Sequence, residues 1–182
     1  MKIENSFRVP IPPEDAWLLL LDVPQIAPCL PGARLTETLP DDTYKGEAVV
    51  KIGPVQFNFA GQAQLVNVDM DARTAQVIAK GADARGRGNA SATVDFALAA
   101  DGDGTRVDIV TDLALAGTVA QYGRASGLVK NIAAELIGQF AKNLERLIAE
   151  GPIEDEVAKQ NRISGLKLLW SASKRMVKGN KE

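Results

Sequence analysis

The hydrophobic pattern changes its period near residue 115, and this change limits the chain to few folds. From residue 33 to residue 115, apolar and polar residues alternate, which is typical of antiparallel strands with one covered face and one solvated face. Five turn signals divide this stretch into about six consecutive strands. They are Pro40-Asp41-Asp42, Gly53-Pro54, Asp69-Met70-Asp71, Gly86-Arg87-Gly88 and Asp101-Gly102-Asp103-Gly104.

From Gly117 to Glu150 the apolar residues recur with a period near 3.6, which predicts one helix of about 30 residues, or roughly 45 Å. Upstream, we expect a strand over 2–9, a helix that starts at Pro13 and a short turn over 23–27. Because only the sheet can cover the apolar stripe of the long helix, the sequence predicts an α+β fold. In this fold a seven-stranded antiparallel sheet wraps around the long C-terminal helix.

The composition excludes several classes of function. The chain has 182 residues, of which 46% are hydrophobic, and a net charge of −2, so we expect a globular domain that does not bind nucleic acid. The absence of His removes nearly all zinc sites and the Ser-His and Cys-His nucleophiles. We therefore expect no metal site, and we assign no catalytic residue and no covalently bound cofactor. The single Cys29 is typical of a reducing compartment.

The N-terminus lacks the apolar core of a secretion signal, and the longest apolar run, Ala16 to Leu21, is too short to span a membrane. The charge changes at Gly151-Pro152. Residues 1–150 carry 14 basic and 19 acidic side chains, whereas residues 151–182 carry 7 and 4. We therefore predict a ligand-binding domain over 1–150 and a basic amphipathic tail over 151–182.

A helical projection of residues 163–178 separates an apolar arc from a basic side. A basic amphipathic helix that carries Trp suits the surface of an anionic bilayer. The same helix could also dock on a partner protein or on the body of this chain. The residues expected to contact membrane or partner are Ile163, Leu166, Lys167, Leu169, Trp170, Lys174, Arg175, Met176 and Lys178.

One helix covers a ribbon only about 10–12 Å wide, so a seven-stranded sheet leaves room beside it. Many inward positions of the predicted sheet hold Ala or Val. These residues either line an apolar cavity or let the helix pack closely on the sheet. Similarly, the Tyr122 hydroxyl either bonds to a ligand carbonyl or belongs to the core. The expected cavity residues are Val50, Phe57, Phe59, Ala79, Ala92, Val94, Phe96, Leu113, Leu115, Tyr122, Leu128, Ile132, Leu136 and Phe140.

Three other motifs favour structural interpretations. The segment 101–104 lacks the later Glu of a calcium loop, so we interpret it as a hairpin turn. The segment 81–88 lacks the strand-to-helix context of a phosphate site, so we interpret it as a turn. Cys29 has no His to activate it, so we interpret it as a structural thiol.

Several short motifs follow one another over residues 1–150. They are Phe7 with Pro12 and Trp17, Asp22 to Pro24, Leu30-Pro31-Gly32-Ala33, Gly53-Pro54, Phe59-Ala60-Gly61, Gly86-Arg87-Gly88 with Ala90, and Gly117 with Gln121-Tyr122-Gly123. In their order and spacing they resemble the family of the G subunit of carbon monoxide dehydrogenase, which belongs to the START-like (SRPBCC) superfamily with the helix-grip fold. The sequence departs mildly at Gln121-Tyr122-Gly123, where the family often has Phe before the Gly.

The resemblance implies a non-catalytic accessory protein. Members of the family accompany molybdenum hydroxylases such as carbon monoxide dehydrogenase. They are thought to attach that enzyme to the inner face of the cytoplasmic membrane and to bind a quinone-like lipid. We therefore expect a cytoplasmic, peripheral membrane protein whose partners are a quinone or lipid, such a hydroxylase and an anionic membrane surface. The alternatives are a cyclase-like or dehydratase-like enzyme that uses Asp, Glu, Lys or Tyr in the same cavity, or an assembly factor for the hydroxylase.

Overall fold

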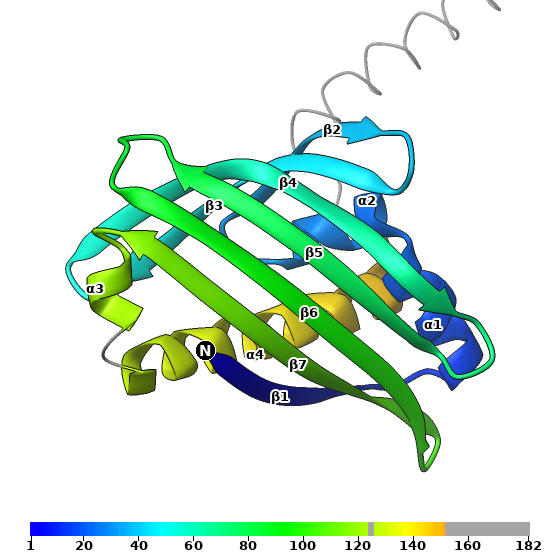
Figure 1. The fold of residues 1–182 in the computed structure, drawn as a ribbon. Coiled ribbons are helices and arrows are strands. Elements are labelled where there is room, and N and C mark those ends of the chain that lie inside the picture. The colour runs from blue at the N-terminus through cyan, green and yellow to red at the C-terminus, as the bar shows by residue number, and fades with distance from the viewer. Residues whose placement is uncertain (124–125, 152–182) are drawn as a thin grey trace, which may run out of the picture. The chain divides into compact units, whose positions relative to one another are not determined.

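The alternating segments form one seven-stranded antiparallel sheet (Figure 1). The computed structural model describes residues 1–123 and 126–151, so the predictions for the basic tail lie outside the described residues. The strand order is β1-β7-β6-β5-β4-β3-β2, which makes β2 to β7 a continuous meander. The strands are β1 (Lys2–Val9), β2 (Ala33–Leu39), β3 (Thr43–Ile52), β4 (Val55–Asp69), β5 (Thr74–Asp83), β6 (Gly88–Asp101) and β7 (Gly104–Gly117).

The predicted fold class and the six-strand meander are confirmed. Each of the five turn signals lies at the junction of two consecutive strands, and three of them overlap the strand ends. Asp41 and Asp42, at φ 57° and 49°, supply the left-handed conformations of the turn between β2 and β3. The helical elements are α1 (Pro13–Leu21), α2 (Val23–Ile26), the 3-10 helix η1 (Ala27–Cys29), α3 (Ala120–Gly123) and α4 (Ser126–Glu150).

The prediction of one continuous helix of about 30 residues from Gly117 onward is wrong. The segment instead forms the short α3 and the 25-residue α4. Gly117 ends β7 at φ 76°, and the Val119 amide then donates a hydrogen bond to the Arg87 carbonyl at 3.2 Å. Because the Val119 side chain is fully buried beside Phe57, this segment is held against the turn between β5 and β6 and does not extend α4.

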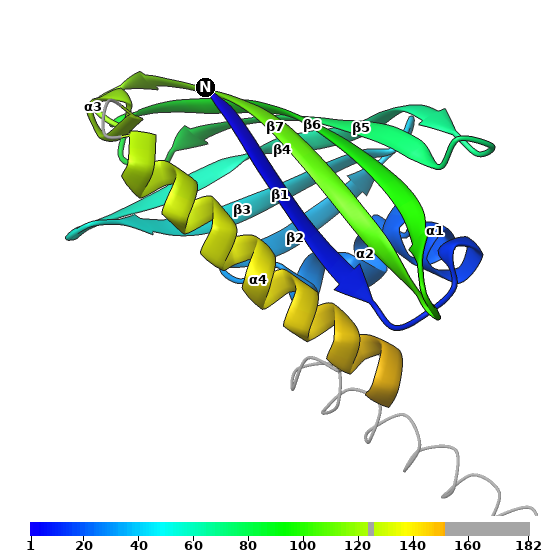
Figure 2. The same ribbon diagram turned by 90° about the horizontal axis from the view of Figure 1, so that it is seen from below.

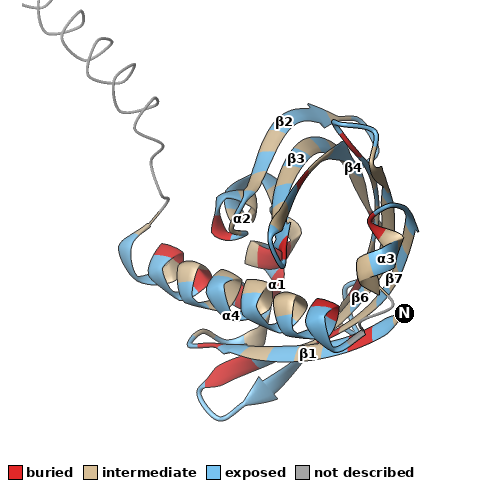
Figure 3. Cartoon of the chain, turned by 90° about the vertical axis from the view of Figure 1, so that its left-hand side faces the viewer, coloured by how far each residue is buried: buried red, intermediate tan, exposed pale blue. Residues whose placement is uncertain are grey.

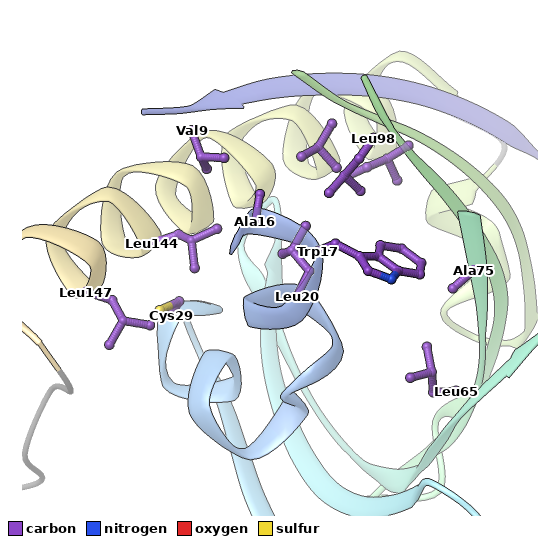
Figure 4. Close-up of a cluster of buried hydrophobic side chains, with 12 residues drawn as sticks. Val9, Ala16, Trp17, Leu20, Cys29, Leu65, Ala75, Leu98, Leu144 and Leu147 are labelled. Atoms are coloured by element: carbon purple, nitrogen blue, oxygen red, sulfur yellow. The ribbon is translucent and has the colours of Figure 1, made fainter. Parts of the chain in front are cut away.

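Two separate clusters make up the apolar core. The α1 cluster, shown in Figure 4, comprises Val9, Ala16, Trp17, Leu20, Cys29, Leu65, Ala75, Leu98, Val107, Ile109, Leu144 and Leu147. The Phe57 cluster comprises Ile52, Phe57 and Val119, with Val50, Val55, Phe59, Leu115, Tyr122 and Ile132 packed against them. The core is therefore divided between two regions of the concave face of the sheet.

Helix α4 contributes to both clusters. Ile132 belongs to the Phe57 cluster, whereas Leu144 and Leu147 belong to the α1 cluster. Figure 2 shows α4 running along the open side of the curved sheet next to β1, and the rings of Phe7 and Phe140 meet edge to face at 5.7 Å. Figure 3 shows α2 between α4 and β2. Helix α2 therefore separates the β2 edge of the sheet from α4.

Candidate functional site

A cavity of about 340 Å³ lies between the concave face of the sheet and the segment formed by α2 and η1. It is open to solvent, and its volume falls in the lower part of the range for small-molecule sites. Strand alternation and register place twelve of its residues on one face of the sheet. The inward-facing residues are Ala33, Leu35, Tyr44, Gly46, Ala48, Phe59, Gly61, Ala63, Ala79, Gly81, Ala90 and Ala92, and the helical segment adds Val23, Ala27 and Leu30.

The cavity exists because two rows of small residues cross the sheet. Gly46, Gly61, Gly81 and Ala90 lie opposite one another on successive strands. The neighbouring row joins Ala63, Ala79 and Ala92 in the same way. A Cβ added at Gly61 would lie 2.0 Å from the Lys80 carbonyl oxygen, so no side chain fits there. The small rows leave this part of the interior unfilled, while Leu65 and Phe57 belong to the separate clusters described above.

The wall of the cavity is apolar except for one phenol. Among the inward-facing residues that line it, Tyr44 carries the polar side chain. Burial raises the pKa of the Tyr44 hydroxyl above its ordinary value, and the Asp42 and Asp22 carboxylates raise it further. The hydroxyl is therefore neutral near pH 7 and able to donate a hydrogen bond.

The charged residues at the cavity occupy the alternate register positions, whose side chains point to the convex face of the sheet. Arg34 pairs there with Glu47 at 2.7 Å, and Lys45 pairs with Glu37 at 2.9 Å. Lys80 is exposed. These residues therefore line the cavity, while their charged groups point away from it.

Asp83 is a buried carboxylate at an inward position, next to Phe59 across the ladder. Arg87 holds it with two hydrogen bonds of 2.8 Å, from Nε to Oδ2 and from Nη2 to Oδ1. The amides of Asn58, Arg85 and Arg87 also donate to it. The Arg87 guanidinium is the main cause of the lowered pKa of Asp83; burial opposes this shift, and the three amides add to it. Asp83 therefore stays ionised near neutral pH and has no proton to give to a substrate.

The contacts of Arg87 are structural. Its Nη2 also donates to the Gln56 carbonyl at 2.7 Å, and its guanidinium lies 4.5 Å from the centroid of the Phe57 ring. This arrangement agrees with a structural interpretation of 81–88, in which only residues 84–87 form the turn between β5 and β6. Segment 101–104 is likewise the hairpin between β6 and β7, and Arg8 pairs with Asp101 and Asp103 there. Cys29 is fully buried, and burial raises the pKa of its thiol.

The residues expected to line a cavity are divided among several regions. Three border the cavity described here: Phe59, Ala79 and Ala92. Five pack in the Phe57 cluster, namely Val50, Phe57, Leu115, Tyr122 and Ile132. Three pack against the α1 cluster, namely Val94, Phe96 and Phe140. Leu113 and Leu136 are half-buried, and Leu128 is 38% exposed. Ligand contact by any of these residues stays a prediction.

The Tyr122 ring packs edge to face on Phe57 at 5.7 Å, in agreement with the core-packing interpretation. The predicted site does not include Tyr44, the glycine row or the helical segment with Val23, Ala27 and Leu30. Alternation in β3 contains the signal for Tyr44, because this residue is in phase with Val50. No local pattern indicates that α2 and η1 cover the small rows.

A curved antiparallel sheet with a C-terminal helix along its concave side defines the class of helix-grip proteins. Within this class, residues 6–149 match the family model of CoxG, the G subunit of carbon monoxide dehydrogenase. The match covers well over half of the chain, so the protein belongs to the CoxG family. The resemblance found in the sequence is thereby confirmed.

Solved structures share the fold at low sequence identity. A conserved protein from Geobacillus kaustophilus is 20% identical with a TM-score of 0.71, and the match covers 84% of this chain and 98% of that one. TTHA0849 from Thermus thermophilus is 18% identical with a TM-score of 0.57 and coverages of 82% and 99%. The ZhuI aromatase/cyclase from Streptomyces sp. R1128 is 13% identical with a TM-score of 0.56 and coverages of 84% and 99%. Likeness at these identities shows the fold alone.

Comparison with curated proteins gives no match. No helix in residues 1–123 and 126–151 combines the length and the hydropathy needed to cross a membrane.

Proposed function

We propose that this protein is a non-catalytic accessory protein that binds an apolar, quinone-like or lipid molecule in the cavity between the sheet and the α2 and η1 segment. Its partner is a molybdenum hydroxylase of the carbon monoxide dehydrogenase type, which it recruits to the inner face of the cytoplasmic membrane. Membership of the CoxG family supports the accessory role. The observation that carries the ligand proposal is the apolar wall of the cavity, in which Tyr44 supplies the polar inward-facing side chain.

The titratable groups in and near the cavity argue against the cyclase-like alternative. Acid–base catalysis needs a group that gains and loses a proton near the working pH, within reach of the substrate. The lowered pKa of Asp83 keeps this buried carboxylate ionised, and Arg87 occupies both of its oxygens. The pKa of Tyr44 is raised, so its hydroxyl does not act as a base near neutral pH. The cavity therefore favours binding over catalysis.

The ligand proposal is tested by extracting the protein purified from cells and identifying the bound molecules by native mass spectrometry. We expect a neutral apolar molecule in wild type and its loss in Ala92→Phe, which places a ring among the small inward residues. The matched control is Ala114→Phe, at an exposed position that the register places on the convex face. Wild-type protein without any bound apolar molecule, or an Ala92→Phe variant that retains it fully, contradicts the proposal.

The membrane proposal depends on the basic tail, whose residues lie outside those that the structure describes. The sequence supports it, because residues 159–182 carry seven basic side chains and one acidic side chain. Each basic residue near an anionic surface contributes on the order of 1 kcal/mol. Sedimentation with anionic liposomes, compared between wild type and a variant with a neutralised tail, tests this part of the proposal.

A further inference from the structure

Tyr44 supplies a polar group at one end of the cavity wall, where it can meet a ligand with one polar end. It is the first inward-facing residue of β3, and it is followed on the same face by Gly46 and Ala48. Its cross-strand neighbour is Ala63, which leaves the phenol without a bulky residue beside it on β4. Among the residues that the structure describes, no hydrogen bond contributes to the raised pKa of the Tyr44 hydroxyl; burial is the main cause, and the Asp42 and Asp22 charges add to it.

Two carboxylates act on this end of the cavity. Asp22 caps α2, where it accepts a hydrogen bond from the Gln25 amide at 3.3 Å. Asp42 lies in the turn that precedes β3. Asp22 directly precedes Val23, which lines the cavity, and Asp42 lies two residues before Tyr44. Burial is the main cause of the raised pKa of the Tyr44 phenol, and these two negative charges add to it. The same charges would oppose another negative charge placed beside the phenol. The nearby cations do not cancel this effect, because Arg34 and Lys45 face the convex side and are paired with Glu47 and Glu37.

We propose that the Tyr44 hydroxyl donates a hydrogen bond to one acceptor oxygen of a neutral apolar ligand, and that Asp22 and Asp42 exclude anionic ligands of the same shape. The ligand class is then a ketone, quinone or ester and not a fatty acid. The polar end of the ligand lies at Tyr44, and its apolar part lies over Ala79 and Ala92. This inference rests on the proposed function, because it requires an apolar occupant in this cavity.

Three probes of matched shape separate the two parts of the inference. They are 2-acetylnaphthalene, which has one carbonyl, 2-isopropylnaphthalene, which has no acceptor, and 2-naphthoate, which is anionic. Binding of each to the full-length protein is measured by fluorescence titration. For wild type we expect 2-acetylnaphthalene to bind at least fivefold more tightly than either of the other two probes.

The variant Tyr44→Phe keeps the ring and removes the donor. We expect it to weaken 2-acetylnaphthalene binding by about fivefold to tenfold, as for one hydrogen bond in an apolar site, and to leave 2-isopropylnaphthalene within twofold. The control Thr93→Val removes a hydroxyl from the convex face of β6 and should change neither affinity. A Tyr44→Phe variant with unchanged ketone affinity overturns the role of Tyr44.

The double variant Asp22→Asn and Asp42→Asn tests the exclusion of anions. Asn can cap a helix and tolerates the φ of 49° at position 42, so the fold should persist. We expect 2-naphthoate to bind at least fivefold more tightly and 2-acetylnaphthalene to stay within twofold. The control with Asp15→Asn and Asp71→Asn removes the same charge from exposed positions and should leave both probes unchanged. Unaltered 2-naphthoate affinity overturns the exclusion, whereas failure of all three probes to bind wild type defeats the proposed function itself.

Discussion

Filling the cavity should make the ligand-free protein more stable, although most changes in a packed interior do the opposite. Ala79 is the central residue of the second small row, with Ala63 on one side and Ala92 on the other. In Ala79→Ile, three carbon atoms are added at an inward position that borders empty space. The β-branched side chain also suits a strand.

The magnitude follows from the apolar surface that the added atoms bury. Three fully buried carbons contribute roughly 2.4 kcal/mol at about 0.8 kcal/mol each. Because the cavity is open to solvent, we expect about half of this gain, or ~1 kcal/mol. A gain of that size raises the melting temperature by about 2–4 °C in a chain of this length. In a solid core, overpacking would instead cost about 1–3 kcal/mol.

The assay is urea unfolding of protein from which bound lipid has been removed with a hydrophobic resin. Titration of 2-acetylnaphthalene on the same samples reports occupancy of the cavity. Ala79→Ile should gain stability and lose binding together. Ala114→Ile, on the convex face of β7, should change both little. If Ala79→Ile loses more than about 1 kcal/mol while Ala114→Ile does not, the interior is filled in solution and the reasoning fails.

Three further predictions concern the clusters, the buried ion pair and the tail. Leu144→Ala removes a fully buried side chain of the α1 cluster and should cost about 2–5 kcal/mol in urea unfolding, against less than about 1 kcal/mol for the 38% exposed Leu128→Ala. The pKa of Asp83 is lower in the folded protein than in the unfolded chain. The ionised carboxylate therefore stabilises the fold at a pH above its pKa in the unfolded chain, and this contribution is lost as the pH falls. The free energy of unfolding of wild type and Arg87→Leu is measured from pH 7 to pH 3. The difference between the two proteins should be largest above about pH 5 and should shrink below about pH 4. A difference that does not change with pH contradicts the stabilising role of the ion pair. Changing four basic residues of the tail to Gln should weaken binding to anionic liposomes, measured by sedimentation, on the order of 100-fold or more; they are Lys167, Lys174, Arg175 and Lys178. The same change at four lysines of the domain should not weaken it; they are Lys45, Lys51, Lys80 and Lys130. Equal sedimentation of both variants contradicts the anchoring proposal.

The sequence predicts the sheet well because its signals are local. Alternation of apolar and polar residues reports which face of a strand is covered, and each turn carries its own Gly, Pro or Asp. The segment between β7 and α3 is not predicted, because contacts distant in the sequence hold Val119 there. Its side chain is buried beside Phe57, and its amide donates to the Arg87 carbonyl.

The location of the cavity could not be predicted from the sequence pattern. The pattern places small residues in the strands, but it predicts that the long helix covers them. In the structure the Asn143 amide donates to the Cys29 carbonyl at 2.9 Å, which fixes η1 against α4. Val23, Ala27 and Leu30 consequently face the small rows. A contact across more than a hundred residues leaves no trace in a local pattern.

The division of the core explains how a stable fold can hold an unfilled interior. An apolar void forgoes contacts, so its lining must be held in place by packing elsewhere. The two clusters provide this packing, and α4 joins them through Ile132 at one and Leu144 at the other. Stability and binding are thus assigned to different residues of the same sheet. Changes at Leu144 or Phe57 should lower the free energy of unfolding, whereas changes at Ala79 or Tyr44 should alter the choice of ligand while the fold persists.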